Sequence, residues 1–185
     1  MVTSSESTIV QRLLAFGATL GADELVFACD SEVGNLLRDD PFGFLLAASV
    51  DRGMKAENAW RLPGRLRREL GHLDPSRIAA MSEENLHHTL NRITGRPRYM
   101  HDAPRTIREV AKSVADEFGG DARHLWRGRP AREIFDRLTH FHGVKKGIAS
   151  MVLNLLHRLG EINLSPDDCE FVNVKVDLHV DFSRF

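Results

Sequence analysis

Cysteine is scarce in this chain: Cys29 and Cys169 stand alone among 185 residues, and no Cys-x-x-Cys pair occurs. A zinc or iron–sulfur site built from a local cluster of cysteines is therefore excluded. The scarcity also fits a reducing compartment. No apolar run approaches the ~18 residues of a membrane-spanning helix, and the first residues lack a signal-peptide pattern. We therefore expect an intracellular protein without a membrane partner.

Charge is unevenly distributed, although the net charge of the whole chain is only −1. Residues 1–51 carry a net charge of −6, residues 52–150 carry +8, and residues 151–185 carry −3. A basic middle segment between acidic ends suggests a surface that binds a polyanion. The alternative is that these charges lie on ordinary solvated helix faces.

Apolar residues recur at helical spacing along most of the chain, which predicts an all-α fold. Asp-Pro pairs at 40–41 and 74–75, and Ser82, are typical of helix starts. Pro63 is expected to bend or restart one helix. Residues 171–180 look strand-like, and residues 95–104 read as a loop. The predicted helices cover residues 7–20, 41–51, 54–70, 106–118, 130–141 and 147–159, with two short ones after Asp74 and Ser82.

Residues 140–156, HFHGVKKGIASMVLNLL, predict two helices joined by a tight reversal. Gly143 would allow a positive φ or a close backbone approach. A helix starting at Gly147 would leave free N–H groups, which favour phosphate, and Lys145 and Lys146 add positive charge there. An ordinary helical hairpin with solvated lysines is the alternative. The apolar faces that join the two helices are expected to contain Ile134, Leu138, Phe141, Ile148, Met151, Val152 and Leu155.

Three segments resemble motifs of one protein family. Residues 141–145, FHGVK, are similar to the L-P-G-V-G hairpin of the endonuclease III-like DNA glycosylases in the helix-hairpin-helix (HhH-GPD) superfamily. Residues 176–180, VDLHV, resemble the V-D-x-H-V segment that follows the hairpin in that family. Residues 41–47, PFGFLLA, resemble its P-F-x-x-L-L/I-A helix, and Tyr99 matches an aromatic residue before the middle helix. The matches occur in family order across residues 40–181.

The resemblance implies two helical lobes with a groove between them. Residues 40–147 would form a central lobe ending in the helix-hairpin-helix, and residues 1–39 and 148–185 would form the second lobe. The implied partner is double-stranded DNA, bound by a monomer that is cytoplasmic and nucleoid-associated or otherwise intracellular. The residues expected to contact DNA are Gly143, Val144, Lys145, Lys146, Gly147, Arg52, Met54, Lys55 and Tyr99.

The resemblance also implies a catalytic carboxylate at Asp177, which would stabilise an oxocarbenium-like sugar or activate water. An exposed or helix-capping aspartate is the alternative. Gly147 occupies the position of the lysine nucleophile of bifunctional members, so a monofunctional enzyme that uses water is expected. The family's four-cysteine motif is absent, and no iron–sulfur cluster or other cofactor is expected. A structural monovalent cation at the hairpin is compatible with the resemblance.

For several side chains the sequence leaves two interpretations open. Arg52 is a candidate for the minor groove and Met54 a candidate wedge, or both lie in a polar turn. Tyr99 would either stack on a base or be buried in the core. Trp60 and Trp126 are predicted to be core residues. Neither His140-x-His142 nor His87-His88 has a third partner at ligand spacing, so no metal site is predicted.

The predicted function is base-excision repair of DNA by a glycosylase that removes a modified or mismatched base. Two departures favour an alternative, a catalytically inactive DNA-binding module of the same fold. Gly147 stands where bifunctional members have a lysine, and Lys145 replaces the second hairpin glycine. Asp102 also stands where a basic residue is often found. A helical protein-interaction domain is the third hypothesis.

Overall fold

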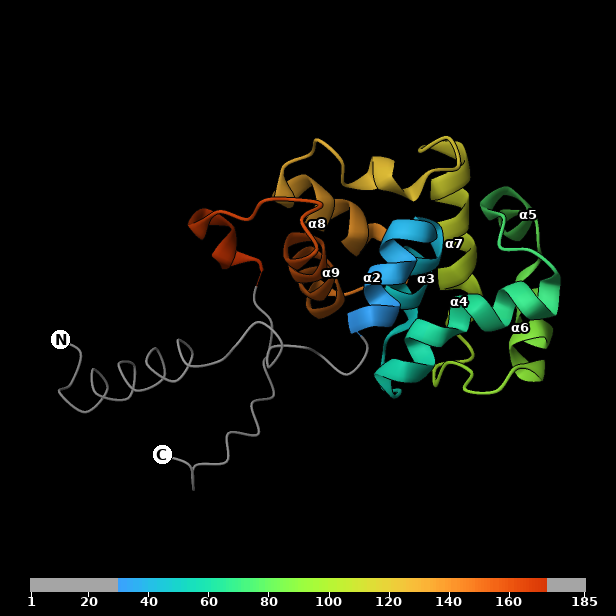
Figure 1. The fold of residues 1–185 in the computed structure, drawn as a ribbon. Coiled ribbons are helices and arrows are strands. Elements are labelled where there is room, and N and C mark those ends of the chain that lie inside the picture. The colour runs from blue at the N-terminus through green and yellow to red at the C-terminus, as the bar shows by residue number, and fades with distance from the viewer. Residues whose placement is uncertain (1–29, 173–185) are drawn as a thin grey trace, which may run out of the picture. The chain divides into compact units, whose positions relative to one another are not determined.

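The structure is a computed structural model in which residues 30–172 are described. Across these residues the chain is helical and contains no strand (Figure 1). The all-α prediction is therefore confirmed for this part of the chain. Its elements are α2 (Asp30–Asp39), α3 (Pro41–Val50), α4 (Ala56–Leu70), α5 (Pro75–Ala79), α6 (Glu83–Arg92), α7 (Ala103–Asp116), η2 (Ala122–Leu125), α8 (Ala131–His140), α9 (Lys146–Arg158) and η3 (Pro166–Glu170).

Helix α3 is the centre of the core. Residues 42–50 are all buried, as expected for a helix that is apolar on every side. The helix begins as the sequence predicts: Pro41 occupies its first turn, and the Asp40 carboxylate accepts the N–H of Gly43 at 3.0 Å. Helices α4, α7 and α9 and the turn η2 pack around α3, as Figure 1 shows for α4 and α7. The loop that follows α3 is therefore anchored at a fixed point.

The remaining helices are amphipathic and bury one face each. Helix α7 packs against α5 and α6 on one side and α3 on another, and α8 packs against α9. The predicted core position of the two tryptophans is confirmed. Trp60 and Trp126 are buried, and their rings lie 5.6 and 6.0 Å from the ring centroid of Phe44.

Helices α4, α7 and α9 differ from the sequence prediction in their continuity or in the residue at which they begin. Helix α4 runs without a restart through Pro63, whose ring is buried in the core, so packing offsets the lost hydrogen bond. Helix α7 begins at Ala103, before the predicted Thr106, because Pro104 is tolerated in a first turn. Helix α9 begins at Lys146 instead of Gly147. The sequence analysis also missed α2 and the two 3₁₀ turns.

Some predictions concern residues that the structure does not describe. The predicted helix at 7–20 and most of the strand-like segment at 171–180 lie outside residues 30–172. The division into two lobes needs both ends of the chain, so it stays a prediction. Within the described residues, no helix is long and apolar enough to cross a membrane.

Candidate nucleic-acid interface

The predicted hairpin is present: α8 ends at His140, α9 begins at Lys146, and a five-residue loop joins them. Gly143 has φ +79°, a conformation that favours glycine. Val144 is buried under the loop, and its N–H donates to the carbonyl of Phe141 at 3.0 Å. No acceptor among residues 30–172 bonds the backbone N–H groups of Gly143, Lys145, Lys146 and Gly147. The loop therefore presents a group of free amide donors.

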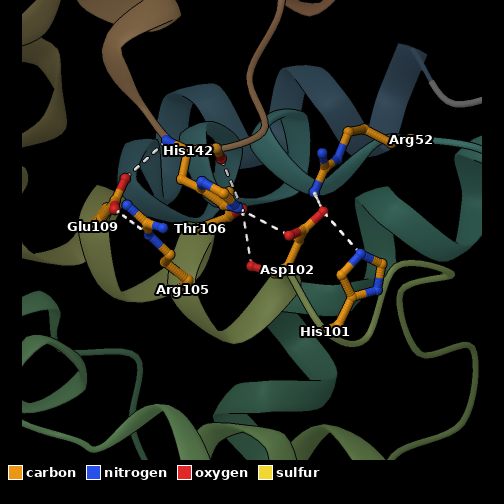
Figure 2. Close-up of polar contacts among 7 residues, drawn as sticks. All are labelled: Arg52, His101, Asp102, Arg105, Thr106, Glu109 and His142. Carbon is orange, nitrogen blue, oxygen red and sulfur yellow. Dashed lines mark hydrogen bonds and ion pairs between the residues drawn. The ribbon is translucent and has the colours of Figure 1, made fainter.

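His142 fixes the hairpin to α7 through its backbone N–H, its carbonyl and its ring Nε2 (Figure 2). Its backbone N–H donates to Glu109 Oε2 at 2.8 Å, and its carbonyl accepts the hydroxyl of Thr106 at 2.8 Å. Its ring Nε2 lies 2.9 Å from Asp102 Oδ1, and because an ionised carboxylate only accepts, Nε2 carries the donated hydrogen. The hairpin loop is thus held by three bonds to one face of α7.

Two carboxylates in this network are stabilised in their charged form. The hydrogen bond from His142, helped by the charges of His101 and Arg52, lowers the pKa of Asp102. Asp102 also lies at the N-terminus of α7, where the helix dipole favours negative charge. Burial alone would raise the pKa of Glu109, but the bonds from Arg105 and the His142 backbone outweigh it and lower that pKa. Both groups are therefore anions near neutral pH.

Asp102 also connects the hairpin to the turn after α3. Arg52 Nη2 lies 3.6 Å from Asp102 Oδ2, and Figure 2 shows Arg52 and His101 converging on this carboxylate. The Arg52 guanidinium lies 5.3 Å from the centre of the Tyr99 ring, within cation–π range. A Cβ atom at Gly143 would meet this guanidinium at about 2.5 Å. A side chain at 143 would therefore displace the Arg52 guanidinium, and the positive φ disfavours any residue but glycine there.

These loops surround one cleft of about 460 Å³, a volume within the usual range for small-ligand sites. Five of the residues predicted to contact DNA line it: Arg52, Tyr99, Gly143, Lys145 and Gly147. They come from three segments that are far apart in the sequence. The other lining residues are Asp51, Gly53, Ile148 and Met151.

Other predicted site residues do not line this cleft. Val144 is buried and supports the loop, while Lys146 is exposed at the start of α9. Lys55 is exposed and occupies the N-cap position of α4. Met54 is half-buried in the turn that precedes α4. Asp177, the predicted catalytic residue, lies outside the described residues.

The structure decides two points that the sequence left open. Tyr99 is 38% exposed, which excludes a core position, and the guanidiniums of Arg52 and Arg98 lie 5.3 and 5.9 Å from the centre of its ring. Lys145 has φ −107°, so this position accepts a side chain without strain, and the absence of the second hairpin glycine does not distort the loop.

Four cleft residues were not among those predicted to contact DNA: Asp51, Gly53, Ile148 and Met151. Ile148 and Met151, which were assigned to the apolar face that joins the hairpin helices, are half-buried and line the cleft. A signal for the α7 network did exist: Asp102, Thr106 and Glu109 have i, i+4, i+7 spacing, which places three polar side chains on one helix face.

Within residues 30–172, no group of three or more His, Cys, Asp or Glu side chains lies close enough together to hold a metal ion. The Phe141 and His142 carbonyls accept the N–H of Val144 and the hydroxyl of Thr106. A carbonyl oxygen has a second lone pair, so a monovalent cation at the hairpin stays a prediction.

Comparison of the chain with protein families, with curated proteins and with solved structures gives no match. The assignment of a function therefore depends on the geometry of the cleft and on the sequence motifs.

Replacing Asp102 with Asn tests the network, because it keeps the side-chain shape and removes the charge. We expect a loss of about 1–2 kcal/mol in the free energy of unfolding at pH 7, measured by urea denaturation. The lowered pKa means that this stabilisation is present above the unfolded-state pKa of about 3.9 and is lost as the pH falls through the folded-state value. The difference between wild type and variant should therefore shrink below about pH 4.

Asp116→Asn is the matched control. Asp116 is exposed and pairs with Lys112 at 2.6 Å on the same helix, so its loss should cost no more than about 0.5 kcal/mol. An equal, small effect of both substitutions would show that the Asp102 network does not stabilise the fold.

Proposed function

We propose that this protein is a monofunctional DNA glycosylase of the helix-hairpin-helix type, which hydrolyses the N-glycosidic bond of a damaged or mismatched base flipped out of duplex DNA. One observation supports this proposal above the others. The hairpin, the turn after α3 and the Tyr99 loop, which the resemblance predicts to contact DNA and which are far apart in the sequence, line one cleft.

The hairpin suits a phosphate of the DNA backbone. Its free amides at Gly143, Lys145 and Gly147 can each donate to a phosphate oxygen. Lys145 and Lys146 are exposed, and neither has an ion-pair partner among residues 30–172. Their charge is therefore available to an anion, and such contacts bind DNA without regard to sequence.

The cleft beside the hairpin suits an extrahelical nucleotide. A base must leave the stack before its glycosidic bond can be reached, and it is then held by stacking and edge contacts. Tyr99 offers an exposed ring, and Ile148 and Met151 add apolar surface. Arg52 is held at the rim by Asp102, in a position to approach the sugar–phosphate backbone.

The chemistry would use Asp177 as an ionised carboxylate. In this reaction the oxygen of water bonds to C1′ of the sugar, the C1′–N bond breaks, and the base leaves as it takes up a proton. The carboxylate would stabilise the positive charge on the sugar and accept a proton from the water. Gly147 has no nucleophile, so no covalent enzyme–sugar intermediate is expected at that position.

The non-catalytic DNA-binding module is the second candidate, and Gly147 is the observation that favours it, since the residue lines the cleft without any reactive group. Both candidates bind duplex DNA through the same hairpin. Base release separates them.

Replacing both Lys145 and Lys146 with Glu should weaken binding to duplexes of any sequence. The dependence of affinity on salt should also become shallower, by a slope of about 1 for each lost phosphate contact. Fluorescence anisotropy at several salt concentrations measures both effects. The control replaces Arg77 and Lys112 with Glu, which makes the same change in charge at exposed positions that do not line the cleft. Equal losses in the two variants would contradict a specific phosphate site at the hairpin.

Replacing Asp177 with Asn should abolish base release and leave duplex binding intact or tighter, because a negative charge is removed. The measurement is release of free bases from duplexes containing deaminated, oxidised or alkylated bases. Wild type should yield intact abasic strands, and borohydride should trap no protein–DNA adduct.

Gly147→Lys is the positive control for trapping, since a Cβ atom at this position meets nothing within 4 Å. Full activity of Asp177→Asn would refute the catalytic assignment. Salt-sensitive binding with no base release from any duplex would establish the non-catalytic module.

A further inference from the structure

Asp51 is a half-buried carboxylate that lines the cleft. It follows the last residue of α3, and its backbone N–H bonds to the carbonyl of Ala48, so its position is fixed by the buried helix. Among residues 30–172, no side chain or backbone group bonds or pairs with the Asp51 carboxylate. The adjacent Arg52 pairs with Asp102 instead. Burial raises the pKa of Asp51, because removal from water disfavours the charged form and no donor offsets this cost.

Among the described residues no buried side-chain oxygen lacks a partner, so the half-buried Asp51 carboxylate is open to solvent and can accept N–H donors from a ligand in the cleft. Two cations line the cleft with it, Arg52 and Lys145, and neither pairs with it. The remaining walls are the Tyr99 ring, the apolar side chains of Ile148 and Met151, and glycine backbone. A planar ligand with N–H donors on one edge could pack against the aromatic and apolar walls and donate those hydrogens to the Asp51 carboxylate.

We propose that Asp51 reads the Watson–Crick edge of a base flipped into this cleft and selects bases that present two adjacent N–H donors. This inference rests on the proposed function and names the class of base that the cleft accepts.

The selection follows from hydrogen-bond chemistry. An ionised carboxylate offers two acceptors and no donor. Guanine presents a ring N1–H beside an exocyclic amino group, which together match the two carboxylate oxygens. Cytosine and adenine present one amino group beside an acceptor nitrogen. Uracil and thymine present one N–H between two carbonyl oxygens that would repel the carboxylate. Guanines modified at C8 or N7 keep the matching edge, so they are the expected class of lesion.

The test measures binding, so that it does not depend on catalysis. Three duplexes carry, at one position, 8-oxoguanine on a 2′-fluoro sugar that resists hydrolysis, uracil on the same sugar, or a tetrahydrofuran abasic analogue. Wild type should bind the 8-oxoguanine duplex more tightly than the uracil duplex. Asp51→Asn should lower affinity for the 8-oxoguanine duplex by roughly 5- to 150-fold. Its affinity for the abasic duplex should rise slightly, because a negative charge is removed and no base is present to be read.

Asp51→Glu keeps the two acceptors and should retain the preference for 8-oxoguanine, whereas the exposed Asp116→Asn controls for a simple loss of charge. If wild type binds all three duplexes without preference, or if Asp51→Asn weakens all three equally, the inference is wrong and the DNA-binding proposal stands. If wild type shows no salt-sensitive binding to any duplex, the proposed function fails as well.

Discussion

The carboxylate of Asp102 is the group on which the arrangement of the cleft depends. One oxygen accepts the ring N–H of His142 in the hairpin, and the other faces Arg52 in the turn after α3. Arg52 and His142, which are 90 positions apart in the sequence, are thereby held around a single negative charge. The hydrogen bond from His142 lowers the pKa of this carboxyl, so it is ionised near neutral pH. Without it, the Arg52 guanidinium would lose its ion pair and keep the contact with the Tyr99 ring.

The cleft combines rigid supports with unpaired groups. The buried helix α3 fixes the turn at Asp51, and three bonds from α7 fix His142. Against this frame, the hairpin amides, Lys145 and the Asp51 carboxylate have no partner within residues 30–172. These unpaired groups are open to solvent, so they are available to a ligand with both acceptor and donor atoms, which is the basis of the proposed nucleotide site.

Local signals in the sequence were sufficient for most of the helices. Asp40-Pro41 and Asp74-Pro75 set helix starts through capping chemistry, and the reversal at Gly143 followed from helical spacing on both sides. The continuity of α4 through Pro63 could not be predicted, because burial in the core decides it. The position of Asp51 in the cleft could not be predicted either. Its lack of a partner within residues 30–172 depends on which side chains surround it in the fold, and no local sequence pattern indicates this. The pairing of Asp102 with His142 joins segments 40 residues apart, which periodicity cannot detect.

The central claim is that the cleft and hairpin are where this protein contacts DNA. Backbone amide signals of ¹⁵N-labelled protein, followed while a duplex with an abasic analogue is added, test it most directly. The account predicts large shifts for the amides of Gly53, Tyr99, Gly143, Lys145 and Gly147, with downfield movement of the hairpin amide protons that bond phosphate. Shifts confined to α5 and α6, with the hairpin signals unchanged, would contradict it.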